Sequence, residues 1–287
     1  MGKEVIGSWL VLSVQVGWHL WPIYLFYTVL MLVVQFILAN GWRWLLETSV
    51  GPLAFQDALI PFAISNLGKY VPGKVLYMVS RVEFASKAGA SRIEALSCFF
   101  LENVYLVVFA TLVSVPAACS YFGISGTWAQ LVIMTLGLTA LVIFLRSNIF
   151  FFLLNKFLAI NNKVPMETAQ TRKLGARLIV NYISVWIIYG AAGAILASIT
   201  FDVPNEQLVQ IGSAFVASWL LGFLTIITPA GLGAREGALV VLLSPVIGPA
   251  ESSILALFAR LFWTIAELGL SASALIYPRP NTTQRPQ

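Results

Sequence analysis

Long apolar runs, separated by short polar connectors, make up most of this sequence. A helix needs roughly 20 consecutive apolar residues to cross a bilayer. Runs that approach or exceed this length predict membrane spans over Val5–Leu20, Pro22–Trp44, Ser91–Ala118, Trp128–Leu145, Leu178–Phe201 and Glu251–Tyr277. The first run is short, so a single span preceded by an interfacial helix is an alternative for the N-terminal region. Ser91, followed three residues later by Glu94, predicts a capping box at the start of its helix.

Two further apolar segments are interrupted by proline and glycine. Each has two arms around a break: Leu53–Leu67 and Val75–Phe84 around 66–74, and Gln207–Ile227 and Ala238–Ile247 around 228–237. Because proline and glycine stop helices, each segment is predicted to be a re-entrant hairpin. The arm Gln207–Ile227 is long enough to span the membrane, which leaves eight spans as the alternative to six spans and two hairpins.

The two broken segments continue along the chain in the same way. After each break come an arginine and a glutamate, a short arm, a glycine, and a long apolar helix with one ionisable residue deep inside it. The matching residues are Arg81, Glu83 and Glu102 in the first copy and Arg235, Glu236 and Arg260 in the second. This pattern predicts an internal repeat, with repeat 1 at about 22–118 and repeat 2 at about 178–277, within a single integral membrane domain over 1–277.

The charges of the connectors predict the topology. Connectors 118–127 and 201–206 contain no lysine or arginine, whereas Ser147–Arg177 contains five. Basic connectors stay on the cytoplasmic side of a membrane, so the two repeats are expected to run in opposite directions, a recurring plan in transporters. The polar, proline-rich tail 278–287 is expected to be disordered and cytoplasmic.

Composition narrows the class of protein further. Hydrophobic residues make up 59% of the chain and charged residues 10%, whereas soluble domains carry about 25% charged residues. An ordinary soluble enzyme, a disordered regulator and a disulfide scaffold are therefore excluded. Continuous apolar runs also differ from the alternating strands of a membrane barrel. The predicted fold class is an all-α polytopic membrane protein.

The net charge of +5 lies in the connectors and follows from topology, so no nucleic-acid partner is expected. The two cysteines, Cys98 and Cys119, and the single histidine, His19, provide no metal or redox spacing. The sequence shows no phosphate loop, nucleophile elbow or dinucleotide fingerprint. We therefore predict no catalytic residue, metal or cofactor, and no enzymatic activity.

Three ionisable residues are predicted to lie at membrane depth. Glu102 and Arg260 each lie about ten residues into a helix, or roughly 15 Å from its start. Charges at this depth usually face a partner or a cavity. Two interpretations follow: a structural Glu102–Arg260 ion pair, or a polar path that also includes Glu267, seven residues beyond Arg260 on the same helix face.

The break at 228–237 is a candidate anion site. Gly231 and Gly233 leave backbone N–H groups accessible, the following helix N-terminus favours anions, and Arg235 adds a fixed cation. The alternative is that Glu236 offsets the helix dipole itself. The break at 66–74 supplies a similar set of cations, Lys69, Lys74 and Arg81.

Three motifs carry a resemblance to a known family. These are Gly-Trp-Arg-Trp at 41–44, Asn-Leu-Gly-Lys-Tyr-Val-Pro-Gly-Lys at 66–74 with Arg81, and Thr-Pro-Ala-Gly-Leu-Gly-Ala-Arg-Glu-Gly at 228–237. Together they resemble the flippase-type membrane domain of lysylphosphatidylglycerol synthases and its stand-alone relatives, over roughly 22–277. The sequence departs from the family at 229–231, where Pro-Ala-Gly replaces the frequent Pro-Gly-Gly. It also lacks the soluble aminoacyl-transferring domain, so synthase activity is not expected.

The resemblance implies a lipid translocase of the bacterial inner membrane, and relatives occur with aminoacylated phospholipids and polyprenyl-phosphate-linked sugars. In this hypothesis Arg81 and Arg235 hold the lipid phosphate, while Glu102, Arg260 and Glu267 line the path. The alternative is a non-transporting accessory subunit that anchors a glycosyltransferase, aminoacyltransferase or other lipid-modifying enzyme through the basic connector. A membrane transferase using a polyprenyl phosphate donor ranks last, since Glu83 and Glu236 are its only candidate carboxylates.

Overall fold

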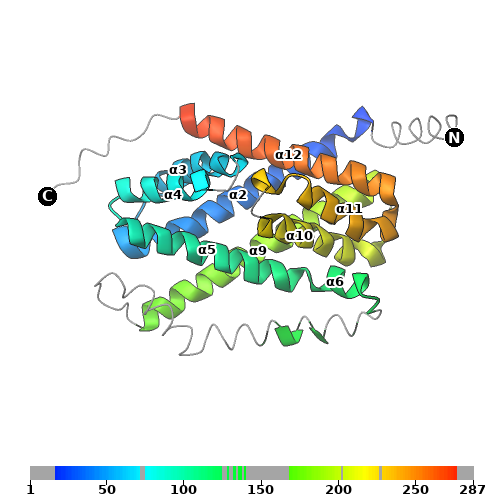
Figure 1. Cartoon of the computed structure of the whole chain (residues 1–287), viewed down its shortest axis with the longest axis horizontal. Helices are drawn as coiled ribbons and strands as arrows, with labels where there is room; N and C mark the ends of the chain where they lie inside the picture. The colour runs from blue at the N-terminus through cyan, green and yellow to red at the C-terminus, as the bar shows by residue number, and fades with distance from the viewer. Residues whose placement is uncertain are drawn as a thin grey trace.

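Nearly all residues that the computed structural model describes are helical (Figure 1). They are residues 17–71, 75–124, 168–201, 203–225 and 228–276, together with scattered positions between 128 and 139. No strand occurs in this part of the chain. The main helices are α2 (Trp21–Val50), α3 (Phe55–Leu67), α4 (Val75–Lys87), α5 (Arg92–Val113), α6 (Val115–Tyr121), α9 (Thr168–Phe201), α10 (Leu208–Leu224), α11 (Ala234–Ile247) and α12 (Pro249–Ile276). Short 3-10 turns are η1 (Trp18–Leu20), η2 (Gly68–Tyr70), η3 (Asn205–Gln207) and η4 (Pro229–Gly231).

Six helical segments of the described residues are long and apolar enough to cross a membrane. They are Trp21–Val50, Arg92–Val113, Lys173–Phe201, Asn205–Leu224, Pro229–Ile247 and Pro249–Ile276. Large apolar side chains on these segments, such as Leu25, Val180 and Leu268, are exposed at the surface, where lipid would cover them. The chain is therefore an all-α polytopic membrane protein, as the sequence predicted.

Four of the predicted spans correspond to α2, α5, α9 and α12, with different boundaries. The predicted Ser91–Ala118 helix is divided between α5 and α6, because Pro116 has no N–H to continue the hydrogen-bond ladder. Helix α9 begins at Thr168, so the end of the predicted basic connector is helical. The capping box is confirmed, since the Glu94 carboxylate accepts from the N–H of Ser91 at 2.8 Å and Ser91 caps the N–H of Glu94. Most of the predicted spans Trp128–Leu145 and Val5–Leu20, and the tail 278–287, lie outside the described residues.

The first broken segment forms two short helices, α3 and α4, joined through η2. Each helix has 13 residues and is therefore about 20 Å long, too short to cross a hydrocarbon core of about 30 Å. The break occurs where the proline and glycines predicted it, although 72–74, which include Lys74, lie outside the described residues.

The second broken segment differs from its prediction at one boundary. Helix α11 begins at Ala234 rather than Ala238, so Arg235 and Glu236 belong to its first turn. Two features start the helix early. Gly233 takes a positive φ of 81° as the N-cap residue, and its N–H donates to the Glu236 carboxylate at 2.7 Å. By length and composition, both arms of this segment are long enough to span.

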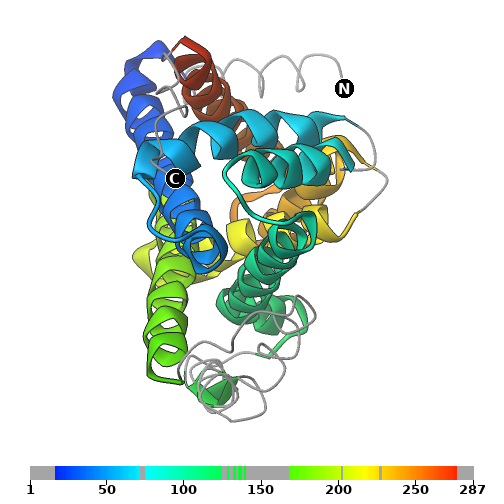
Figure 2. The same cartoon turned by 90° about the vertical axis from the view of Figure 1, so that its left-hand side faces the viewer.

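The two halves of the fold make matching contacts. Helix α3 packs on α12 and α10 packs on α5, while α2 contacts α12 and α9 contacts α5. Helices α2 and α9 run in opposite directions, as do α5 and α12 (Figure 1). The α3–α4 and α10–α11 pairs lie at opposite ends of the molecule, with the former nearest the viewer in Figure 2. Their breaks point inward, and η2 contacts η4.

Candidate functional site

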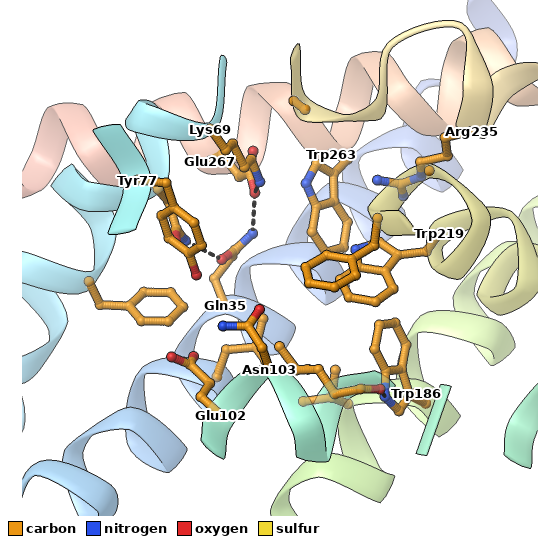
Figure 3. Close-up of a pocket in the computed structure, with 18 of the residues that line it drawn as sticks. Gln35, Lys69, Tyr77, Glu102, Asn103, Trp186, Trp219, Arg235, Trp263 and Glu267 are labelled. Carbon is orange, nitrogen blue, oxygen red and sulfur yellow. Dashed lines mark hydrogen bonds and ion pairs between the residues drawn. The ribbon is translucent and has the colours of Figure 1, made fainter. Parts of the chain in front are cut away.

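A cavity of about 110 Å³ lies where the two breaks meet. Polar and aromatic side chains from both halves line it (Figure 3). They include Gln35, Asn66, Lys69, Tyr77, Glu102, Trp186, Trp219, Arg235, Arg260, Trp263 and Glu267. The sequence had placed five of these residues in a phosphate site or a polar path, and the fold brings all five to the same cavity.

Glu267 is the most highly connected carboxylate of the cavity. It is buried, with 2% of its surface exposed, and forms an ion pair with Lys69. Its carboxylate also accepts hydrogen bonds from the Tyr70 hydroxyl at 2.7 Å and from the Gln35 amide at 2.9 Å. Since Lys69 comes from η2 and Glu267 from α12, this pair joins the first half of the fold to the second.

A chain of amide side chains continues from Glu267 across the cavity. The Gln35 amide oxygen accepts from Asn66 at 3.3 Å, and the Asn66 oxygen accepts from Arg81 at 3.2 Å. The close-up in Figure 3 shows Gln35 between Glu267 and Tyr77, at the centre of this chain. Sequence reasoning missed Gln35, although an amide in the middle of a 30-residue, largely apolar helix is itself a signal for a polar interior.

Arg81 is enclosed beside the cavity. No part of its side chain is exposed, and it forms an ion pair with Glu102 at 3.5 Å. Its guanidinium donates to the Tyr77 hydroxyl at 3.1 Å and lies 4.2 Å from the ring centre of Phe62 and 4.6 Å from that of Trp42. This buried cation is therefore balanced by one carboxylate and held by aromatic rings.

Arg260 has a different partner from the one that the sequence predicted. Its Nε lies 3.5 Å from the Glu236 carboxylate, and its guanidinium donates to the carbonyl of Ala230 at 3.2 Å. The Glu102–Arg260 ion pair, one of the two interpretations that the sequence left open, is therefore wrong. Each long helix instead pairs with the short helix packed on it, because α4 lies on α5 and α11 lies on α12. The prediction that Glu102 and Arg260 face the protein interior is confirmed, with side-chain exposures of 1% and 11%.

Arg235 is the unbalanced charge of the cavity. It is 93% buried, since 7% of its surface is exposed, and its guanidinium donates to the Tyr189 hydroxyl. It lies 5.4 Å from the centre of that ring and 5.0 Å from the ring of Trp263. Among the described residues no carboxylate forms an ion pair with it. An isolated buried charge is costly, so this cation favours an anion in the adjoining space.

Aromatic side chains form the remaining wall of the cavity. Trp186 and Trp219 pack with ring centres 4.4 Å apart, and Trp263 packs edge-on against Tyr189 at 5.3 Å. Trp186 donates its indole N–H to the carbonyl of Leu106 at 3.0 Å. The indole N–H of Trp263 is buried without a hydrogen-bond partner, which leaves one donor for a ligand in the cavity. Sequence reasoning missed this wall, because tryptophan in an apolar helix is usual.

The glycines of the second break shape the turn. Gly231 has a φ of 72°, and a Cβ added to it would lie 2.7 Å from the carbonyl oxygen of Gly222. The N–H of Gly233, a predicted phosphate donor, is already bound by Glu236. Glu236 thus caps the helix as the alternative interpretation held, and it also neutralises Arg260.

Ala230 has a φ of 50° and a ψ of 21°. This left-handed conformation costs an L-residue about 1–2 kcal/mol. We expect Ala230→Gly to stabilise the protein by about 0.5–1 kcal/mol, because the relief of strain exceeds the added entropy of the unfolded glycine. Thermal unfolding in detergent measures the effect. Ala272→Gly, in the exposed part of α12, is the control and should destabilise by about 1 kcal/mol. A lower unfolding midpoint for Ala230→Gly would show that the turn is unstrained.

The fold and this cavity together define a multi-pass membrane protein with a charged interior site. The family profile described as the lysylphosphatidylglycerol synthase TM region matches residues 6–269. The chain belongs to this family, as its motifs indicated. No curated protein and no solved structure matches it.

Proposed function

We propose that this protein is a lipid translocase that carries a phosphate-bearing lipid headgroup across the bacterial inner membrane. Its family consists of membrane regions related to lipid handling, and its apolar helices are long enough to cross a membrane, which would put the site within the bilayer. A membrane-associated glycosyltransferase or aminoacyltransferase would act as a partner by producing or consuming the lipid. The translocase itself would perform no covalent chemistry.

The observation that carries this proposal is the unbalanced Arg235. Its guanidinium has a hydroxyl and two aromatic rings as partners, and it lines a cavity enclosed at the meeting point of the two breaks. Guanidinium binds phosphate with two parallel, charge-assisted hydrogen bonds. A phosphate beside Arg235 would neutralise the buried charge and accept from the unpartnered N–H of Trp263.

The matching contacts of the two halves suggest how the site is reached. We propose that the α3–α4 and α10–α11 pairs are re-entrant hairpins of an inverted repeat, which enter the membrane from opposite sides. Non-helical backbone is tolerated at membrane depth where protein or water surrounds it, and the turns η2 and η4 are in contact with each other. Broken helices that meet at the midplane provide the binding site in many transporters.

The size of the cavity requires a conformational change during transport. A volume of about 110 Å³ is well below the roughly 300 Å³ at which ligand sites begin. A phosphate group fits, whereas a whole headgroup enters after the two halves separate. The Lys69–Glu267 pair joins the halves, so its opening would admit the headgroup from one side of the membrane at a time.

The accessory-subunit hypothesis depends on the basic connector 146–177. Most of that connector lies outside the described residues, and nothing in the described part of the chain favours docking over transport. The buried, charged cavity where the two breaks meet supports transport of a charged headgroup. Transport is therefore the function we propose.

The test is headgroup flipping in reconstituted vesicles containing fluorescent phosphatidylglycerol. We expect the wild-type protein to accelerate flipping and Arg235→Gln to slow it by roughly tenfold or more, since a charge-assisted hydrogen bond contributes about 1.5–3 kcal/mol. Arg92→Gln, at an exposed position at the start of α5, is the matched control and should flip normally. Equal flipping by Arg235→Gln and wild type would remove the proposed role of Arg235. Loss of flipping in step with loss of thermal stability would assign Arg235 to folding.

A further inference from the structure

The charges of the cavity specify the charge of the headgroup, an inference that rests on the proposed translocase function. The carboxylate of Glu267 is bound by Lys69, the Tyr70 hydroxyl and the Gln35 amide, which occupy three of the roughly four lone-pair positions of a carboxylate. Its oxygens are therefore largely committed to groups of the protein.

The other two carboxylates are also matched to cations. Glu102 is paired with the fully buried Arg81. Glu236 is paired with Arg260 through one oxygen and accepts from the N–H of Gly233 through the other. A ligand ammonium group entering the site would meet carboxylates whose charge a basic side chain of the protein already balances, although the Glu102 and Glu236 oxygens that face those cations make no hydrogen bond.

Arg235 remains as one positive charge without a counterion among the described residues. The positive side chains Lys69, Arg81, Arg235 and Arg260 thus face the carboxylates of Glu102, Glu236 and Glu267, an excess of one positive charge. In a site of low dielectric constant an unpaired charge is strongly unfavourable. A ligand with one negative charge removes this penalty, whereas a ligand with net positive charge increases it.

We propose that the site selects a phosphodiester monoanion whose remaining headgroup is uncharged, such as a polyol or a sugar, and that it rejects cationic aminoacylated lipids. The phosphate would bind Arg235. The indole N–H of Trp263, buried at 4% exposure and without a hydrogen-bond partner, supplies a further donor in the same cavity. Both phosphatidylglycerol and a polyprenyl monophosphate sugar carry this chemistry.

The experiment compares three probes in vesicles that contain the wild-type protein. They are fluorescent phosphatidylglycerol, fluorescent lysylphosphatidylglycerol with the same acyl chains, and a polyprenyl-phosphate-linked glucose. We expect at least one of the two monoanionic probes to flip roughly tenfold faster than the lysyl lipid, because placing like charges together in a desolvated site is strongly unfavourable. Whichever monoanion flips faster identifies the source of the headgroup. Flipping of the lysyl lipid as fast as both monoanions, or faster, would overturn the proposal.

Binding separates this inference from the translocase function. The three lipids are added to the protein in detergent, and the unfolding midpoint is recorded. A monoanionic lipid should raise the midpoint of the wild type and of Arg92→Gln but not of Arg235→Gln, and the lysyl lipid should raise none of them. If no probe flips but this binding pattern holds, the translocase function fails and the charge selection stands. Equal stabilisation by the lysyl lipid and the monoanions overturns the charge selection whether or not flipping occurs.

Discussion

Glu102→Leu is expected to lower the free energy of unfolding by about 3–5 kcal/mol, the usual effect of removing one member of a buried ion pair. The substitution leaves Arg81 charged, with none of its side chain exposed to water. The neighbouring rings and the Tyr77 hydroxyl do not replace a full negative charge. Arg81→Met should be destabilising for the converse reason, because it leaves the Glu102 carboxylate unpaired.

The double variant Arg81→Met with Glu102→Leu is expected to recover most of the lost stability. Replacing both members of a buried pair with apolar side chains removes the two desolvation penalties together. Thermal unfolding of the wild type, the two single variants and the double variant in detergent gives the coupling energy between Arg81 and Glu102. Additive losses in the double variant would show that the two side chains act independently. Glu102 lines the cavity and Arg81 is enclosed beside it, so normal flipping by the double variant would show that transport needs neither charge.

Glu267→Gln is expected to slow lipid flipping by roughly tenfold or more. This is the largest expected effect on transport after that of Arg235→Gln. The variant loses the charge-assisted bond to Lys69, and a bond of this kind contributes about 1.5–3 kcal/mol. The glutamine keeps the shape of the side chain but leaves Lys69 without its carboxylate. A second unbalanced cation would then hold the phosphate beside Arg235. A lipid that is bound more tightly in its resting complex leaves the site more slowly. Phosphatidylglycerol should therefore bind more tightly to this variant while it flips more slowly.

The flipping rate and the lipid-induced shift in the unfolding midpoint together test this prediction. Glu251→Gln is the control on the same helix, because Glu251 lies in the first turn of α12 and away from the cavity. Faster flipping together with weaker binding in Glu267→Gln would show that Lys69, freed from Glu267, does not hold the phosphate. Lys69→Met combined with Glu267→Gln restores the charge balance and should reverse the tighter binding.

Hydrophobicity and helix-stopping residues predicted much of the fold, and the physical reason is that both act locally. The four long helices α2, α5, α9 and α12 follow from apolar runs long enough to cross a membrane. The break after α3 follows from proline and glycine. The boundary errors occurred where a side chain acted on backbone a few residues away. Glu236 capping the N–H of Gly233, which starts α11 early, is the clearest case.

Depth along a helix was also predictable, because it depends on counting residues at about 1.5 Å each. Glu102 and Arg260 were placed at similar depths in this way, and both face the interior. Their partners were not predictable, because equal depth is compatible with any neighbouring helix. The packing of α4 on α5 and of α11 on α12 decided that Arg81 would pair with Glu102 and Glu236 with Arg260.

The sequence by itself determined that this is a helical membrane protein of the lysylphosphatidylglycerol synthase TM family, with charged residues in and beside two broken segments. Tertiary structure alone decided which of those charges are neutralised. Charge pairing is a contact over a few ångströms between helices that are distant in the chain, as for Lys69 and Glu267. Local patterns contain no information about such contacts. Once the helices are packed together, Arg235 is the cation of the cavity without a paired carboxylate among the described residues. The other charged side chains of the cavity form ion pairs.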